Sequence, residues 1–260
     1  MQDLSKALIA EFIGTFGLIF FGGGAAAMVA TGHAGLLDAA LANGLAVAIA
    51  AFVFGDISGG LVNPAITLGA AVAGKLPPAR IVPYIAAQIA GGIVAGLILG
   101  FVFAHDHSGT HMSPYGDLGA TLINTKLTTI TGGFVLEMLG TFFLMSTVLH
   151  TAMSDRAGAV APLAIGLTIS ISVMFFGGLT GASLNPARTI GPAVASGVYT
   201  DIWVYLVATP IGAMAAGLLY RVMRAGKALP AAELPAHDGP GRAPLCVRPS
   251  CPRVRTNPEA

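Results

Sequence analysis

Charged residues and cysteines are both scarce in this chain. Only 10% of its 260 residues are charged and 55% are hydrophobic, a composition that excludes an ordinary soluble domain. Several stretches of about 20 residues carry almost no charge, which predicts helices that cross a membrane. The net charge of +1 gives no sign of nucleic-acid binding. The two cysteines, Cys246 and Cys251, both lie near the C-terminus, so no disulfide framework supports the fold.

The few basic residues predict how the chain crosses the membrane. They gather at Lys6, at residues 74–80, around Arg156 and after Arg221, whereas Lys126 is nearly alone in the other loops. The positive-inside rule places these basic ends in the cytoplasm. We therefore expect both termini to be cytoplasmic and six spans, at about residues 7–30, 39–57, 79–104, 131–151, 159–177 and 202–223.

One stretch of the chain occurs twice. Residues 58–74 read SGGLVNPAITLGAAVAG and residues 180–196 read TGASLNPARTIGPAVAS, with nine identical positions. In each copy Asn-Pro-Ala predicts the start of a helix, because Asn caps helices well and Pro suits the first helical position. The apolar run that follows is too short to cross a bilayer. Residues 64–74 and 186–196 are therefore expected to be half-helices that enter the membrane and turn back.

A second pair of similar segments extends the repeat over both halves. Residues 10–16, AEFIGTF, are echoed by residues 136–142, LEMLGTF. Each half then has three spans and a half-helix, and an odd number of crossings gives the halves opposite orientations. We expect an all-α membrane protein built as an inverted repeat, with a first repeat at 1–104, an external connecting loop at 105–130, a second repeat at 131–224 and a disordered cytoplasmic tail at 225–260.

Half-helices that enter from opposite faces should have their N-termini near the middle of the membrane. Non-helical backbone at that depth is tolerated where it lines a water-filled cavity, so the loops before Asn63 and Asn185 should present carbonyl oxygens to a pore. Each helix N-terminus carries roughly half a positive charge, which disfavours cations and protons there. The asparagine oxygens can cap the helices and leave N–H donors for a permeant. This arrangement favours a passive channel for neutral solutes.

Three charged residues are expected at membrane depth. Glu11 and Glu137 occupy matching places in the two repeats, where their carboxylates can accept hydrogen bonds from the buried loops; a proton relay is the alternative. Arg188 directly follows the second Asn-Pro-Ala sequence. This position favours a narrow external constriction that adds a second positive barrier; a structural salt bridge is the alternative.

The chain resembles the aquaporin and glycerol-facilitator family, the major intrinsic proteins, from about Leu8 to Arg224. The resemblance rests on the paired Asn-Pro-Ala motifs, on Arg188 after the second motif and on the Glu-x-x-Gly-Thr-Phe echoes. It implies six-helix subunits, normally homotetrameric, with one pore each and no cofactor, in the cell (inner) membrane. It also implies that Glu11 and Glu137 hold the loops, and that the pore motifs are Asn63, Pro64, Ala65, Asn185, Pro186 and Ala187.

Four side chains form the external selectivity filter in this family, and they correspond here to Asn43, Val173, Ala182 and Arg188. Water channels usually have Phe and His in place of the first two, and glycerol facilitators usually have Trp, Gly and Phe in place of the first three. Without an aromatic ring, the opening should be wider than a single-file water filter. The Val-Ala-Arg part is similar to nodulin-26-like channels and to bacterial channels for uncharged metalloids, whereas Thr189 and Trp203 are typical of water channels.

The sequence thus predicts a passive channel for water and small uncharged solutes, with glycerol-like polyols, arsenite and boric acid as candidates, that excludes ions and protons. A secondary transporter with an inverted repeat, a strict water channel and a junction protein are the alternatives. An enzyme fits poorly, because no nucleophile, base and orienting group fall at one depth, so no catalytic residue is assigned. Metal binding is an alternative for the tail cysteines and for a histidine cluster, which we interpret as free thiols and a solvated loop: His105, His107 and His111, with Asp106.

Overall fold

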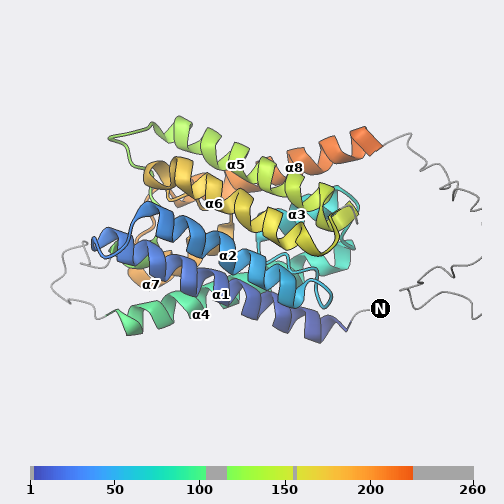
Figure 1. Ribbon diagram of the computed structural model, residues 1–260, viewed down its shortest axis with the longest axis horizontal. Coiled ribbons are helices and arrows are strands. Elements are labelled where there is room, and N and C mark those ends of the chain that lie inside the picture. The colour runs from blue at the N-terminus through green and yellow to red at the C-terminus, as the bar shows by residue number, and fades with distance from the viewer. Residues whose placement is uncertain (1–2, 104–115, 155–156, 225–260) are drawn as a thin grey trace, which may run out of the picture. The chain divides into compact units, whose positions relative to one another are not determined.

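The computed structural model describes residues 3–103, 116–154 and 157–224, and within these ranges every regular element is a helix (Figure 1). Six helices are long and apolar enough to cross a membrane, which confirms the predicted spans: α1 (Leu4–Ala30), α2 (Leu36–Phe54), α4 (Ile81–Val102), α5 (Ile130–His150), α6 (Ala161–Thr180) and α8 (Ile202–Arg224). Two shorter helices, α3 (Pro64–Val72) and α7 (Pro186–Ser196), begin at the two Asn-Pro-Ala sequences.

Some helix ends differ from the prediction by up to three residues, for local reasons. Helix α2 begins at Leu36 rather than at residue 39, because the carboxylate of Asp38 accepts a hydrogen bond from the backbone N–H of Gly35 at 2.7 Å and closes the first turn. Helix α3 ends at Val72 rather than at residue 74, because Gly74 has a φ of +73° and turns the chain away. The tail at 225–260, with Cys246 and Cys251, lies outside the described residues, as do the loop residues His105, Asp106, His107 and His111.

The two halves make the same helix contacts. In the first half, a Cβ at Gly91 on α4 would collide with the carbonyl oxygen of Phe12 on α1, and in the second half a Cβ at Gly212 on α8 would collide with that of Met138 on α5. Small residues at these places let the helix backbones touch. The equivalence of α1 with α5 and of α4 with α8 is what a repeated unit predicts.

Helices α2 and α6 cross at the junction of the two halves. Gly44 on α2 and Gly166 on α6 face each other so closely that a Cβ on either would collide with the carbonyl oxygen of the other. The two residues occupy matching places in the repeat, as Glu11 and Glu137 do on α1 and α5. These pairs give the register of the two halves: residues of α1 match those 126 positions later on α5, and residues of α2 match those 122 positions later on α6.

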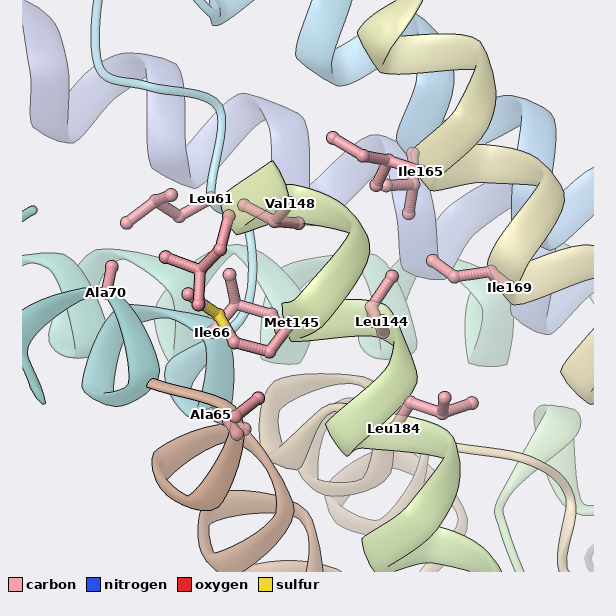
Figure 2. Packing of buried hydrophobic residues seen from close by; sticks show 14 of the residues in the cluster. Leu61, Ala65, Ile66, Ala70, Leu144, Met145, Val148, Ile165, Ile169 and Leu184 are labelled. Atoms are coloured by element: carbon pink, nitrogen blue, oxygen red, sulfur yellow. The ribbon is translucent and has the colours of Figure 1, made fainter. Parts of the chain in front are cut away.

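The helices carry apolar side chains on both their inner and outer faces. Inside, Leu61 and Leu184 from the two loops pack with Ile66 of α3 and with Met145 and Val148 of α5 (Figure 2). Outside, large hydrophobic side chains stay exposed at 60% or more, as at Phe21, Phe101, Phe143 and Phe175. A surface of this kind suits contact with lipid rather than with water.

Candidate functional site

The two short helices start with the same capping hydrogen bonds. Asn63 Oδ1 accepts from the backbone N–H of Ala65 at 2.8 Å and of Ile66 at 3.4 Å. Asn185 Oδ1 accepts from the N–H groups of the residues at the same two places in α7, at 3.0 and 3.4 Å. Pro64 and Pro186 occupy the first helical positions, where a missing N–H has no cost. The repeated sequence therefore builds two helix N-termini with identical chemistry.

The asparagine side chains also join the two halves to each other. Asn63 Nδ2 donates to the carbonyl oxygen of Leu184 at 2.8 Å, and Asn185 Nδ2 donates to that of Val62 at 2.9 Å. The two N-termini therefore meet inside the protein. Each carboxamide has two N–H groups, and one of them is used in this way, so at most one per asparagine can serve a permeant.

The loops before these helices have an unusual backbone conformation. Three residues other than glycine adopt positive φ angles there, namely Val62 at 43°, Ala182 at 43° and Leu184 at 52°. This conformation costs about 1–2 kcal/mol for a residue with a Cβ, so the surrounding structure must hold the loops in place.

Glu11 is one of the groups that hold the first loop. It is fully buried, and its Oε1 accepts from Ser58 Oγ at 2.6 Å and from the N–H of Leu61 at 3.0 Å. Its Oε2 accepts from the N–H of Val62 and from Gln88 Nε2, both at 2.7 Å. Four donors on one carboxylate compensate the cost of burying its charge.

Glu137 holds the second loop in the same way. Its Oε1 accepts from Thr180 Oγ1 at 2.6 Å and from the N–H of Ser183 at 3.0 Å, and its Oε2 accepts from the N–H of Leu184 at 2.8 Å. A cavity runs past the two loops, and neither Glu11 nor Glu137 is among the residues that line it. Their geometry agrees with the loop-supporting role that the resemblance implies.

Two tyrosines also hold the two loops in place, and neither was predicted as a site residue. The hydroxyl of Tyr84 donates to the carbonyl oxygen of Ser58 at 3.0 Å, and that of Tyr205 donates to the carbonyl oxygen of Thr180 at 2.6 Å. Both tyrosines are buried in long apolar helices, at matching places in the repeat. A polar tip at equivalent positions of two apolar spans was the sequence signal for this pair.

A cavity of about 300 Å³ runs past both loops and both asparagines. Its walls are mainly aliphatic, with polar groups supplied by Asn43, Asn63, Ser183, Asn185 and Arg188. Among the predicted filter residues Asn43, Ala182 and Arg188 line it. Val173 is not among the lining residues; it is 4% exposed and belongs to the hydrophobic core.

Arg188 is buried and held by the backbone of the segment that connects the two halves. Its Nη1 donates to the carbonyl oxygen of Gly119, and its Nε is buried without a hydrogen-bond partner. Within the ranges that the structure describes, Arg188 forms no ion pair, so the alternative of a structural salt bridge finds no support. The guanidinium instead places a positive charge beside the cavity.

The connecting segment takes a larger part in the site than the sequence suggested. Residues 105–130 were expected to form a polar external loop, but in the described portion Leu118 is fully buried. Thr121 Oγ1 lies 2.9 Å from Thr189 Oγ1, which lies 2.6 Å from Ser183 Oγ, so a chain of hydroxyls ties the segment to the second loop. The segment has no hydrophobic period that would have predicted its burial. The carbonyl that it offers Arg188 belongs to Gly119, where a φ of +76° and the nearby carbonyl oxygen of Gly23 leave no room for a side chain.

Comparisons with known proteins show the family to which the chain belongs. The family model described as Major intrinsic protein matches residues 1–220. The chain belongs to the major intrinsic protein family. "Aquaporin NIP1-1" from Zea mays is 38% identical over 225 residues, covering 84% of this chain and 75% of that protein. "Aquaporin AqpM" from Methanothermobacter thermautotrophicus is 37% identical over 249 residues, covering 86% and 99%.

A solved structure shows the same fold. The aquaglyceroporin from Plasmodium falciparum superposes with a TM-score of 0.74 at 28% identity, covering 84% of this chain and 96% of that one. Together with the six apolar helices, these matches identify a multi-pass membrane protein and a channel for water and small solutes rather than an enzyme. Among the described residues no three His, Cys, Asp or Glu side chains gather as a metal site would require.

Proposed function

We propose that this major intrinsic protein is a passive channel for water and for small uncharged solutes that carry hydroxyl groups: glycerol-like polyols, arsenite and boric acid. The observation that carries the proposal is the cavity wall, because none of the described residues that line it is aromatic. Asn43 stands at the filter position where water channels of the family usually have Phe, and Ala182 stands where glycerol facilitators usually have Phe. A filter without rings leaves room for a solute larger than water.

The same cavity accounts for the exclusion of ions and protons. Two capped helix N-termini meet beside it, each with roughly half a positive charge, and Arg188 adds a full charge. No carboxylate is found among the described lining residues to offset them. A cation would lose its water shell here without gaining a counter-charge, whereas a neutral solute has no such barrier.

The structure favours a channel over a secondary transporter. A coupled transporter needs an ionisable group that meets the substrate or the coupling ion. Glu11 and Glu137 are fully buried, accept hydrogen bonds from the loops and do not line the cavity. Flux that saturates or follows a proton gradient would support the transporter instead.

Stopped-flow measurements on proteoliposomes test the solute range. We expect water, glycerol and arsenite to enter and sorbitol to be excluded or slow, and water flux with exclusion of every solute would show a strict water channel. Asn43→Phe should lower glycerol permeability about tenfold or more while water still passes, because a ring narrows the filter. Leu45→Phe is the matched control, since Leu45 lies on the same helix and is 49% exposed on its outer side.

We further propose that Pro64, Ala65, Pro186 and Ala187 serve as the structural part of the pore motifs, and that Val173 shapes the filter from behind rather than by direct contact. The subunit is proposed to form homotetramers in the cell (inner) membrane, with one pore each. Support for this comes from the family and from the exposed apolar faces, as at Phe101 and Phe175.

A further inference from the structure

Asn43 is held in one orientation by two backbone carbonyls. Its Nδ2 donates to the carbonyl oxygen of Ala39, one turn earlier on α2, at 2.8 Å, and to that of Gly22 on α1 at 3.3 Å. Both amide hydrogens are thereby used, so the side on which the oxygen lies is fixed. Oδ1 has no hydrogen-bond partner among the described residues, yet it is not one of the enclosed, unpartnered atoms. Because Asn43 is one of the residues that line the cavity, this unbonded and accessible oxygen is available as an acceptor to a solute there.

Gly22 provides the room for this orientation. A Cβ at position 22 would overlap Asn43 Oδ1 and would lie 2.7 Å from Cγ and 3.1 Å from Nδ2. The three nearest atoms all belong to Asn43, so no atom of another residue lies closer than 3.1 Å to that Cβ position. Gly22 lies within α1 and does not adopt a positive φ, so backbone geometry does not require glycine either.

The second half of the protein shows that the repeat does not need a glycine and an asparagine at the places of Gly22 and Asn43 in order to pack. In the register of the two halves, Val148 takes the place of Gly22 and Ile165 takes the place of Asn43. Both are apolar, and both line the cavity. The pair of Gly22 and Asn43 therefore occurs in one half only. This is the half whose α2 carries the predicted filter position.

Arg188 supplies the complementary group. Its Nη1 is used by Gly119, while Nη2 has no hydrogen bond among the described residues and is not one of the enclosed, unpartnered atoms. The cavity is thus lined by a fixed acceptor on Asn43 and an open donor on Arg188. A hydroxyl group both donates and accepts, so it can satisfy both sides.

We infer that Gly22 is a positioning residue that seats the Asn43 carboxamide with Oδ1 toward the permeant, and that the filter thereby favours neutral solutes with hydroxyl groups. This inference rests on the proposed channel function. Gly22 acts only through Asn43, so the two residues should be coupled: an added methyl group at position 22 matters only when the carboxamide is present.

A double-mutant cycle in proteoliposomes tests the coupling, with glycerol and water permeabilities as readouts and the amount of reconstituted protein measured for each variant. Gly22→Ala should lower glycerol permeability relative to water by about fivefold, the loss expected for one hydrogen bond. On the Asn43→Ala background the same substitution should have no effect, because the methyl group enters emptied space. Gly17→Ala is the control on both backgrounds, since a Cβ at Gly17 meets nothing within 4 Å on the same helix.

Asn43→Leu gives a second test that leaves Gly22 unchanged. It removes the acceptor at similar volume, so glycerol permeability should fall relative to water by the same factor. The inference is overturned if Gly22→Ala has no effect, or if its effect persists on the Asn43→Ala background, which would indicate a defect of helix packing. If the unmodified protein passes water alone, the proposed solute range fails, and the coupling is then read from water permeability.

Discussion

At the scale of the residue, the two buried glutamates carry the clearest chemistry. The hydrogen bonds of Glu11 and Glu137 come from the backbone and side chains around the two loops, and three loop residues with a Cβ adopt strained positive φ angles. A carboxylate can accept at both oxygens, whereas a carboxamide of the same shape can accept at only one. What the loops require is therefore a side chain that can accept hydrogen bonds at both of its oxygens.

Glu11→Gln and Glu137→Gln should each destabilise the protein by about 1–3 kcal/mol, because each leaves a buried N–H of the loop facing another donor. Thermal unfolding in detergent measures the loss. Asp38→Asn is the control, since the hydrogen bond of Asp38 to Gly35 is exposed and its loss should cost less. Unchanged unfolding together with loss of a proton-driven flux would favour the relay instead.

Only some residues of this site could be predicted from the sequence. Asn63, Asn185 and Arg188 stand in a short linear motif, so residue type and spacing were enough to find them. Asn63 also bonds the carbonyl of Leu184, and Arg188 that of Gly119, at separations of 121 and 69 residues. Because the acceptors are backbone groups, their residue types carry no trace of the contact, and only the fold reveals it.

At the scale of the element, glycines decide how closely the helices pack. Span number and order were predictable, because apolar length and basic flanks are properties of consecutive residues. The pairing of helices was not, since Gly91 and Gly212 look like the other glycines of these spans until their neighbours are known. What distinguishes them is a backbone carbonyl of the next helix in the space that a side chain would need.

Gly212→Ala should therefore destabilise the contact of α8 with α5 strongly, by about 1–3 kcal/mol, because the methyl group meets the Met138 carbonyl and can be accommodated only if backbones shift. The melting temperature in detergent should fall accordingly. Gly178→Ala on α6 is the matched control and should be neutral, since a Cβ there meets nothing within 4 Å. Equal melting temperatures for the two variants would show that the helices adjust without strain.

At the scale of the whole molecule, the inverted repeat sets the topology. Figure 1 shows the start of α1 and the end of α8 at the same end of the helix bundle, as six spans require. Both ends are expected to be cytoplasmic, because Lys6, Arg221 and Arg224 flank them.

Cysteine labelling in intact cells tests this orientation, since Cys246 and Cys251 are the only cysteines of the chain. A membrane-impermeant maleimide should label them only after the cells are permeabilised. In a variant whose two cysteines are replaced by serine, Lys126→Cys places a thiol on an exposed residue of the connecting segment and should react in intact cells. Labelling of the tail in intact cells would reverse the assigned topology.

The hydrogen bonds that Asn63 and Asn185 each donate to the opposite loop also bear on the order of synthesis. The carbonyl that Asn63 needs belongs to a residue made 121 positions later, so the first loop leaves the ribosome before its partner exists. The growing chain must hold that loop without its partner in the membrane while three further spans, α4, α5 and α6, are inserted. Neither half can finish its pore alone, and separately expressed halves should mature only when both are made in the same cell.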